Sequence, residues 1–378
     1  MMNLTDLWIW QSPSWTDFQW QDELILPRLR DTRLKLGVLL GKASLNTSTE
    51  QSLDTLLANI IASSAIENEQ LNVESVRSSL AKHLGLSSEQ LYPTSDRSEG
   101  LAAMMLDVLQ NQHAPLTTPR LFQWHEWLFP SPKEDEWSSQ TIIVGKLRGD
   151  EPMQVVSGRL DKQTVHFEAP PRDQLEQELD QFISWFNQSY QQSDLDPLLR
   201  AAITHFWFVT LHPFDDGNGR ITRALTDMAL AQADSQSVRL YAMSVAILEN
   251  RKEYYQILEQ SQSFDSAKDL TPWLLWFFDS LDISLDNAMN AIDATLLKTQ
   301  FWQMHHDSGL SEGQVKVLNR LLDDGEKEFV EGISASQYQK VAKVSKATAT
   351  RHLADLLDKL CIEKLPGGGR STRYCIKF

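Results

Sequence analysis

Twelve consecutive residues combine side chains that can bind a nucleotide and move a proton. Residues 212–223 read HPFDDGNGRITR. His212 offers an imidazole base for an incoming hydroxyl, and Asp216 offers the hard oxygen ligand that magnesium prefers. Arg220 and Arg223 are three residues apart, so they share a helix face and can both reach phosphate oxygens. The string therefore predicts a nucleoside triphosphate site.

Two predicted helices position this string. Residues 196–211 carry apolar side chains at helical spacing, and Pro213 disfavours helical geometry at the residue before it. A second helix is predicted over residues 218–233. The loop between them leads into a helix N-terminus, where Gly217 and Gly219 let backbone amides approach an anion closely.

The string resembles the signature of the Fic family, HxFx(D/E)GNGRxxR, with every fixed position filled. The matching residues are His212, Phe214, Asp216, Gly217, Asn218, Gly219, Arg220 and Arg223. The resemblance implies transfer of the AMP part of ATP to a Ser, Thr or Tyr hydroxyl of a target protein or of the protein itself. A helix–loop–helix with solvated arginines is the alternative, and it leaves this combination of side chains unexplained.

The resemblance also implies roles for single residues. His212 would take the proton from the target hydroxyl, Phe214 would anchor the loop in the core, and Asp216 would hold magnesium. Residues 217–219 would line the α- and β-phosphates. Arg220 would neutralise the phosphates and the pyrophosphate leaving group.

A second motif lies far upstream, at the end of a helix predicted over residues 48–66 with Ser48 as its cap, and the predicted inhibitory segment runs over residues 48–68. Ser63 and Glu67 are four residues apart and share a helix face. Residues 63–68 resemble the Fic inhibitory motif, (S/T)xxxE(G/N). The resemblance implies that Glu67 pairs with Arg223, which would otherwise reach the γ-phosphate, and crowds that phosphate out. A solvated carboxylate at a helix end is the alternative.

A hairpin is predicted within residues 141–171, from strand-forming runs separated by turn residues. It resembles the flap with which the family holds a target peptide by strand addition. The docking candidates are Val165, His166, Phe167 and Glu168. An ordinary surface hairpin would carry the same pattern.

Residues 253–262 form a further helical segment with aromatic and amide side chains near one face. The resemblance implies that Tyr254 and Gln262 contact the adenine, although the family usually has asparagine where this chain has Gln262. Tyr255 is the neighbouring aromatic residue. Core packing is an alternative for either tyrosine.

The C-terminal tail resembles a winged helix-turn-helix: helices over 311–324, 334–342 and 346–360 precede two strands. From residue 334 to the end, nine Lys/Arg stand against three Asp/Glu, a net charge of +6 in a chain of −16. This contrast favours a nucleic-acid surface. The DNA-contact candidates are Lys346, Arg351, Arg370 and Arg373. Protein contacts or dimerisation are the alternative use of the tail.

Length and composition limit the class of protein and its domain organisation. The chain has 378 residues and two cysteines, without a Cys/His pattern typical of zinc. No apolar run approaches membrane-spanning length, so we expect a cytoplasmic protein with no membrane partner. We expect a mainly α fold with a small β-hairpin. The predicted domains are an N-terminal helical region (1–105), a Fic catalytic core (106–299) and a winged helix (300–378).

Two classes of function remain open from the sequence. The first is a magnesium-dependent protein adenylyltransferase restrained by Glu67. The second is a DNA-binding regulator with the Fic core as a nucleotide sensor. The intact His212 favours the enzyme, because a sensor needs no general base. Removal of AMP, another nucleotide donor and a homodimer are also left open.

Overall fold

The structure is a computed structural model that describes most of the chain. The described residues are 8–46, 49–86, 92–130, 142–159, 162–191, 194–233, 240–264, 268–324, 329, 331–366 and 372–378. The predicted cap Ser48 and the candidate Arg370 lie outside them. Within the described residues, no helix is both long and apolar enough to span a membrane.

The chain folds into two units, Met1–Ala288 and Met289–Phe378. The fold is mainly helical with a small antiparallel hairpin, as predicted. The predicted boundary near residue 105 falls inside α4 (Asp96–Gln110), within the first unit. Helix α4 packs against both α3 and α5, so no boundary forms there. The predicted boundary near residue 300 falls inside α11 (Thr271–Met304). The boundary between the two units also lies within this helix, after Ala288.

The first unit contains these elements before α11: η2 (Ile9–Gln11), α1 (Asp22–Asn46), α2 (Thr49–Ile66), α3 (Val73–His83), α4, α5 (Thr118–Leu128), β1 (Gln154–Arg159), β2 (Lys162–Glu168), α6 (Arg172–Ser189), α7 (Pro197–Leu211), α8 (Asn218–Ala233), α9 (Met243–Glu249) and α10 (Arg251–Ser261).

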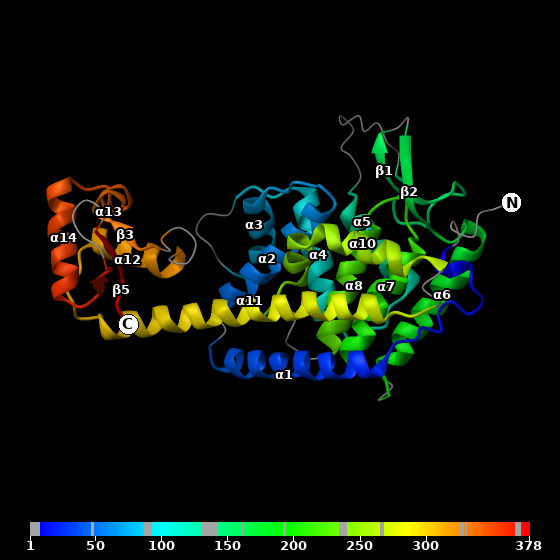
Figure 1. Ribbon diagram of the computed structural model, residues 1–378. Helices are drawn as coiled ribbons and strands as arrows, with labels where there is room; N and C mark the ends of the chain where they lie inside the picture. The colour runs from blue at the N-terminus through cyan, green and yellow to red at the C-terminus, as the bar shows by residue number, and fades with distance from the viewer. Residues whose placement is uncertain are drawn as a thin grey trace. The chain divides into compact units, whose positions relative to one another are not determined.

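Helices α7 and α8 form the centre of the first unit (Figure 1). Asp196 caps α7 by accepting a hydrogen bond from the Leu198 amide, and Pro197 occupies the first turn, where no amide donor is needed. Every residue of α7 after Pro197 is buried, so the helix has no solvent-exposed face. The predicted end of the helix at Leu211 and the predicted start of α8 at Asn218 are confirmed.

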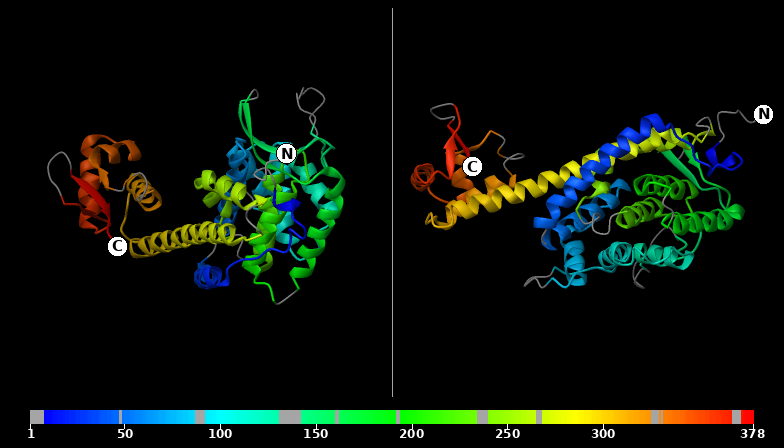
Figure 2. Two further views of the ribbon diagram at one scale, coloured as in Figure 1. Left: turned by 45° about the vertical axis from the view of Figure 1, so that its right-hand side comes forward. Right: turned by 90° about the horizontal axis from the view of Figure 1, so that it is seen from below.

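Helix α1 runs beside the first part of α11, as the views agree (Figures 1 and 2). The Thr32 hydroxyl donates to Asp282, and the Lys35 ammonium pairs with Asp286. Before α1, the Trp-rich segment of residues 8–20 packs on the helical core: Trp15 and Phe18 both contact the Trp207 ring edge-on.

The predicted hairpin is present as the antiparallel pair β1–β2, which projects from the helical core (Figure 1). Ser157 pairs with Thr164, and a register shift falls between Val155 and Val156. Because the sheet has only these two strands, each strand has one edge without a strand neighbour.

The second unit contains the end of α11, then α12 (Glu312–Asp324), β3 (Ile333–Ser334), α13 (Ala335–Ala342), α14 (Lys346–Asp358), β4 (Ile362–Lys364) and β5 (Arg373–Ile376). The strands form one antiparallel sheet in the order β3-β5-β4. The predicted order, three helices followed by two strands, is observed, and β3 adds a third strand. Lys343 has a left-handed backbone at the end of α13, which permits the tight turn into α14.

Candidate active site

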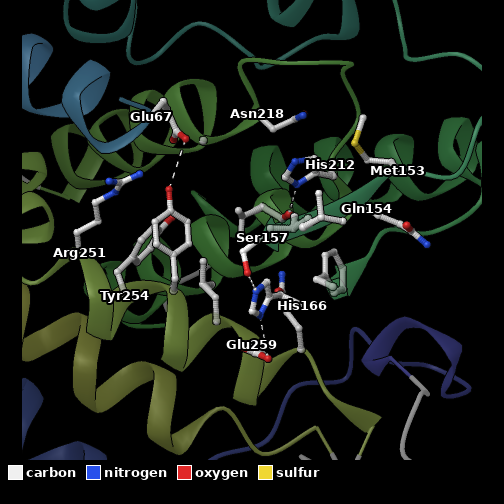
Figure 3. A pocket seen from close by; sticks show the side chains of 18 of the residues that line it. Glu67, Met153, Gln154, Ser157, His166, His212, Asn218, Arg251, Tyr254 and Glu259 are labelled. Carbon is white, nitrogen blue, oxygen red and sulfur yellow. Dashed lines mark hydrogen bonds and ion pairs between the residues drawn. The ribbon is translucent and has the colours of Figure 1, made fainter. Parts of the chain in front are cut away.

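A cavity of about 820 Å³ opens beside the loop between α7 and α8. Four parts of the first unit line it: the turn after α2, the hairpin, the α7–α8 loop and α10 (Figure 3). These segments are far apart in the sequence. Tertiary packing therefore gathers the upstream motif, the hairpin and the HPFDDGNGR string around one space.

His212 lies at the entrance to the loop, with the left-handed backbone φ of 47° that ends α7. This region is strained for a residue with a side chain, and such strain is often stored at functional positions. Its Nδ1 donates to the Val209 carbonyl oxygen at 2.9 Å, which leaves Nε2 as the acceptor. Burial lowers the pKa of His212 below its ordinary value. The imidazole is therefore neutral at neutral pH, as a general base must be.

Arg148, which the sequence analysis did not single out, holds this loop from the side of the hairpin. Its Nε donates to the His212 carbonyl oxygen at 2.9 Å, and its Nη2 donates to the Pro170 carbonyl oxygen. Burial lowers its pKa to about 10, so the guanidinium keeps its charge at neutral pH. No local pattern marks this arginine, because its partners are 22 and 64 residues away.

Side chains of the α7–α8 loop hold the loop in its conformation. Asn218 accepts from the Phe214 amide at 2.9 Å and donates to the Phe214 carbonyl at 2.7 Å. The fully buried Phe214 ring stacks on His125 at 4.4 Å, as expected for an anchor. Gly217 has a φ of 80°, and a side chain there would collide with the Phe129 ring. Asn218 thus fixes the loop with its side chain while it also lines the cavity.

Asp216 is the carboxylate with the chemistry for magnesium. It lines the cavity with its side chain 56% exposed, and its Oδ1 accepts from the Gly217 amide. The described residues contain no cluster of three or more His, Cys, Asp or Glu that could hold a metal ion. One carboxylate facing a phosphate pocket fits magnesium, which usually binds through one or two carboxylates and the phosphates.

Glu67 lies in the turn just beyond α2, which ends at Ile66 as predicted. Its Oε1 accepts from Arg223 Nη2 at 2.8 Å, and Arg223 also donates to the hydroxyl and carbonyl of Ser63. The pairing expected from the motif is therefore present. Burial opposes the charge on Glu67, but the neighbouring Arg223 outweighs it and lowers the pKa.

The Glu67 carboxylate also approaches the N-terminus of α8. A Cβ at Gly219 would overlap Glu67 Oε1, so only glycine permits this contact. Helix N-termini attract anions, and here a carboxylate lies where the sequence predicts phosphates. Helix α2 is fastened in this place by Asn59, which donates to Asp227 of α8 at 2.7 Å and accepts from the Ser244 amide.

Arg220 is paired with a second acid of the same turn, Glu69, which the sequence analysis missed. Arg220 Nη1 donates to Glu69 at 2.6 Å, and Arg97 of α4 donates to both Glu69 oxygens. The two guanidiniums lie over the Phe129 ring, 5.0 and 5.3 Å from its centroid. The only signal in the sequence was a second glutamate two residues after Glu67.

The α10 candidates line the cavity but are also tied to the core. Tyr254 is buried, and its hydroxyl is 2.9 Å from His205 Nε2. Gln262 is buried and donates to the Thr210 hydroxyl at 3.0 Å. Tyr255 and Arg251, at the cavity wall, reach the upstream motif instead: the Tyr255 hydroxyl is 3.5 Å from Glu67, and Arg251 donates to Asn68 at 2.9 Å.

The hairpin candidates differ in their surroundings. Val165 is exposed, whereas Phe167 is buried beneath the ring of Trp8. His166 lies between the Ser157 hydroxyl at 2.6 Å and Glu259 of α10 at 3.1 Å (Figure 3). The Glu168 carbonyl accepts from Trp10 Nε1 at 2.7 Å. The exposed strand edges, rather than Phe167, are therefore the surface suited to an added peptide strand.

Two sequence families match parts of this chain. Residues 115–230 match the Fic/DOC family, and residues 8–86 match a domain of unknown function, DUF4172. The first match covers the loop, α7 and most of α8. The protein therefore contains a Fic/DOC domain.

Curated relatives and a solved structure agree with that assignment. The protein adenylyltransferase fic-1 of Caenorhabditis briggsae is 22% identical over 274 residues, which cover 72% of this chain and 48% of that protein. The protein adenylyltransferase Fic of Drosophila willistoni is 31% identical over 108 residues, 29% of this chain and 20% of that protein. This chain thus spans about half the length of such relatives or less.

A Fic family protein of Desulfovibrio desulfuricans G20 shares the fold. Its structure has a TM-score of 0.54 and 18% sequence identity, and the match covers 93% of this chain and 96% of the other.

The tail candidates fall into three groups. Lys346 and Arg351 are exposed on α14. Arg373 instead donates to the Gly332 carbonyl oxygen at 2.9 Å, so part of its guanidinium serves the fold. Arg370 lies outside the described residues.

Proposed function

We propose that this protein is a protein adenylyltransferase that transfers AMP from ATP to a hydroxyl side chain, of a target protein or of itself. The observation that carries the proposal is the placement of a neutral His212 and the α8 N-terminus on one cavity. The relatives named protein adenylyltransferase support it.

The geometry suits an in-line displacement at the α-phosphate. The hydroxyl oxygen forms a bond to the α-phosphorus, the bond to the bridging oxygen breaks, and pyrophosphate leaves. His212 Nε2 takes the hydroxyl proton, while Nδ1 stays bonded to the Val209 carbonyl and orients the ring. The amides at the start of α8 and Arg220 neutralise the phosphates, which is most of what phosphoryl transfer requires. Asp216 would hold magnesium, which neutralises charge on the phosphates when bound.

The test is incubation with α-labelled ATP and magnesium, followed by mass spectrometry of the protein. We expect AMP on a hydroxyl side chain. The His212→Ala variant should bind ATP as before and transfer about 10²–10⁴-fold more slowly. Labelling at the unaltered rate would overturn the role of His212. Release of AMP from a modified substrate, or transfer from another nucleotide only, would favour the alternatives within this enzyme class.

We further propose that Glu67 restrains the enzyme. Its carboxylate neutralises the Arg223 guanidinium and lies against Gly219, at the helix N-terminus. A γ-phosphate would meet negative charge there and lose its arginine partner. ATP would then bind in a posture unsuited to in-line attack.

DNA binding by the second unit is a second candidate. Lys346 and Arg351 lie on the exposed side of α14, the second helix of the α13–α14 pair. In helix-turn-helix proteins the second helix enters the major groove. The basic tail of an acidic chain supports this proposal.

A further inference from the structure

Two glutamates of one turn contact the two arginines of the phosphate-binding string. Glu67 pairs with Arg223, and Glu69 pairs with Arg220. They differ in where they lie: Glu67 lines the cavity, whereas Glu69 is not among the residues that line it. Glu69 therefore does not occupy the space that the nucleotide would need.

Glu69 is itself held in place from the opposite side. Arg97 donates to it through Nε at 2.8 Å and through Nη2 at 2.7 Å, the fork geometry that fixes a carboxylate most firmly. Arg97 comes from α4, so the contact joins the turn after α2 to a third element. The carboxylate thus has a defined orientation before it meets Arg220.

Arg220, like Glu69, is not among the residues that line the cavity, but these contacts hold its guanidinium behind Asp216, which does line it. The Arg220 side chain is only 5% exposed, and its Nη2 is 3.4 Å from Asp216. Its Nε has no hydrogen-bond partner among the described residues. A buried guanidinium donor without a partner is costly, and a phosphate oxygen would satisfy it.

We propose that Glu69 and Arg97 are positioning residues that hold the Arg220 guanidinium for the nucleotide phosphates. This inference rests on the proposed transferase function. It gives the two glutamates opposite roles: Glu67 restrains the reaction, and Glu69 supports it. Without Glu69, Arg97 and Arg220 would be two unshielded cations over the Phe129 ring and would repel each other.

The experiment uses the full chain with Glu67→Gly, in which transfer should be measurable. Adding Glu69→Gln keeps the shape of the side chain and removes its charge. We expect kcat to fall about 10–100-fold, with the KM for ATP changed less than about threefold, because a displaced catalytic group can cost about 10² in rate. Arg97→Gln should lower kcat in the same direction, and the Glu69→Gln/Arg97→Gln double variant should be no worse than Glu69→Gln alone.

Asp107→Asn is the matched control, because it removes another partly buried carboxylate–arginine pair, which joins α4 to α5. Asp107 accepts from Arg120 at 2.8 Å and is not among the residues that line the cavity. It should change thermal stability but leave kcat unaltered. Equal losses of kcat in Glu69→Gln and Asp107→Asn would make Glu69 an ordinary structural contact and overturn the inference. A rise in labelling on Glu69→Gln would make it a second restraint and overturn it too.

Failure of the proposed transferase function can be distinguished from failure of this inference about Glu69. If Glu67→Gly transfers no AMP, the transferase proposal fails, and calorimetric binding of an ATP analogue with an unreactive α–β bridge tests the positioning. Glu69→Gln should then weaken analogue binding by no more than about threefold when Arg220 is present, in keeping with the small change in KM, and have no effect in an Arg220→Ala variant. Equal effects in both backgrounds would overturn the inference.

Discussion

Glu67 and His212 face one cavity, and at neutral pH both side chains are deprotonated, one as a charged carboxylate and the other as a neutral imidazole. The Arg223 guanidinium keeps Glu67 ionised despite burial, and burial keeps His212 neutral. The ionised acid is the form that pairs with the arginine, and the neutral imidazole is the form that accepts a proton. At neutral pH the proposed restraint and the proposed base are therefore both in the forms that these roles require.

Replacing Glu67 with glycine should raise transfer. Arg223 would be free to bind the γ-phosphate. The repulsion between the Glu67 carboxylate and the phosphates at the α8 N-terminus would also disappear. We expect autolabelling with α-labelled ATP to increase at least about tenfold, the effect of about 1.4 kcal/mol in the barrier. Adding Arg223→Ala should abolish the gain, because the two residues act as one pair. If Glu67→Gly labels no faster than the unaltered chain, the restraint by Glu67 is disproved.

The pH dependence of kcat should report the protonation of His212. Its neutral form is active, and burial lowers its pKa, so the rate should stay level as the pH falls through about 6.5 and decline only below that. The nearby Glu67 charge raises this pKa in part, so the decline should begin at a still lower pH in Glu67→Gly. The measurement is the pH–rate profile of that variant. A decline centred above the ordinary histidine range would contradict the assignment.

At the scale of elements, the N-terminal segment connects the hairpin to α10. Trp10 donates to the Glu168 carbonyl, Trp8 packs on Phe167, and the Ile9 amide donates to the Gln262 carbonyl at 2.8 Å. These contacts fix two walls of the cavity relative to each other. The region matched to DUF4172 thus contributes both the brace of the hairpin and the turn that carries Glu67.

Trp10→Phe should loosen the hairpin without disturbing the core. An aromatic ring is kept, while the Nε1 hydrogen bond, worth about 1 kcal/mol, is lost together with the five-membered part of the indole. Amide hydrogen exchange over residues 154–168 should accelerate about fivefold. Trp20→Phe, which removes an indole bond to Asp22 on the surface, is the control and should leave that exchange unaltered. Equal exchange in both variants would show that Trp10 does not brace the hairpin.

At the scale of the whole molecule, charge is divided between the ends of the chain. The total is −16, while the last 45 residues carry +6. An acidic first unit would repel nucleic acid, so any DNA contact should be confined to the basic tail. The salt dependence of DNA binding measures such a contact.

Lys346→Ala and Arg351→Ala should each weaken DNA binding by the full chain. Each lost phosphate contact should reduce the slope of log K against log salt by about one unit. Lys298→Ala removes the same charge from the second unit at a residue that pairs with Asp323, and it should leave the slope unaltered. If the unaltered chain shifts no DNA fragment at low salt, the tail serves protein contacts instead.

The sequence by itself determined the local features of this protein. Apolar spacing and Pro213 were enough to predict where α7 ends, and the string from His212 to Arg223 was enough to predict the Fic/DOC domain, because both signals lie within a few turns of chain. The hairpin and the helices of the tail followed from the same short-range patterns.

Only the tertiary structure decided which charges meet. Glu69 reaches Arg220 across 151 positions, and Arg148 reaches His212 across 64. No periodicity encodes such pairs. The Glu69–Arg220 pair forms where the Asn59–Asp227 hydrogen bond joins α2 to α8, and in both pairs burial removes competing water from the guanidinium. The same packing buried Phe167, a docking candidate by sequence, beneath Trp8.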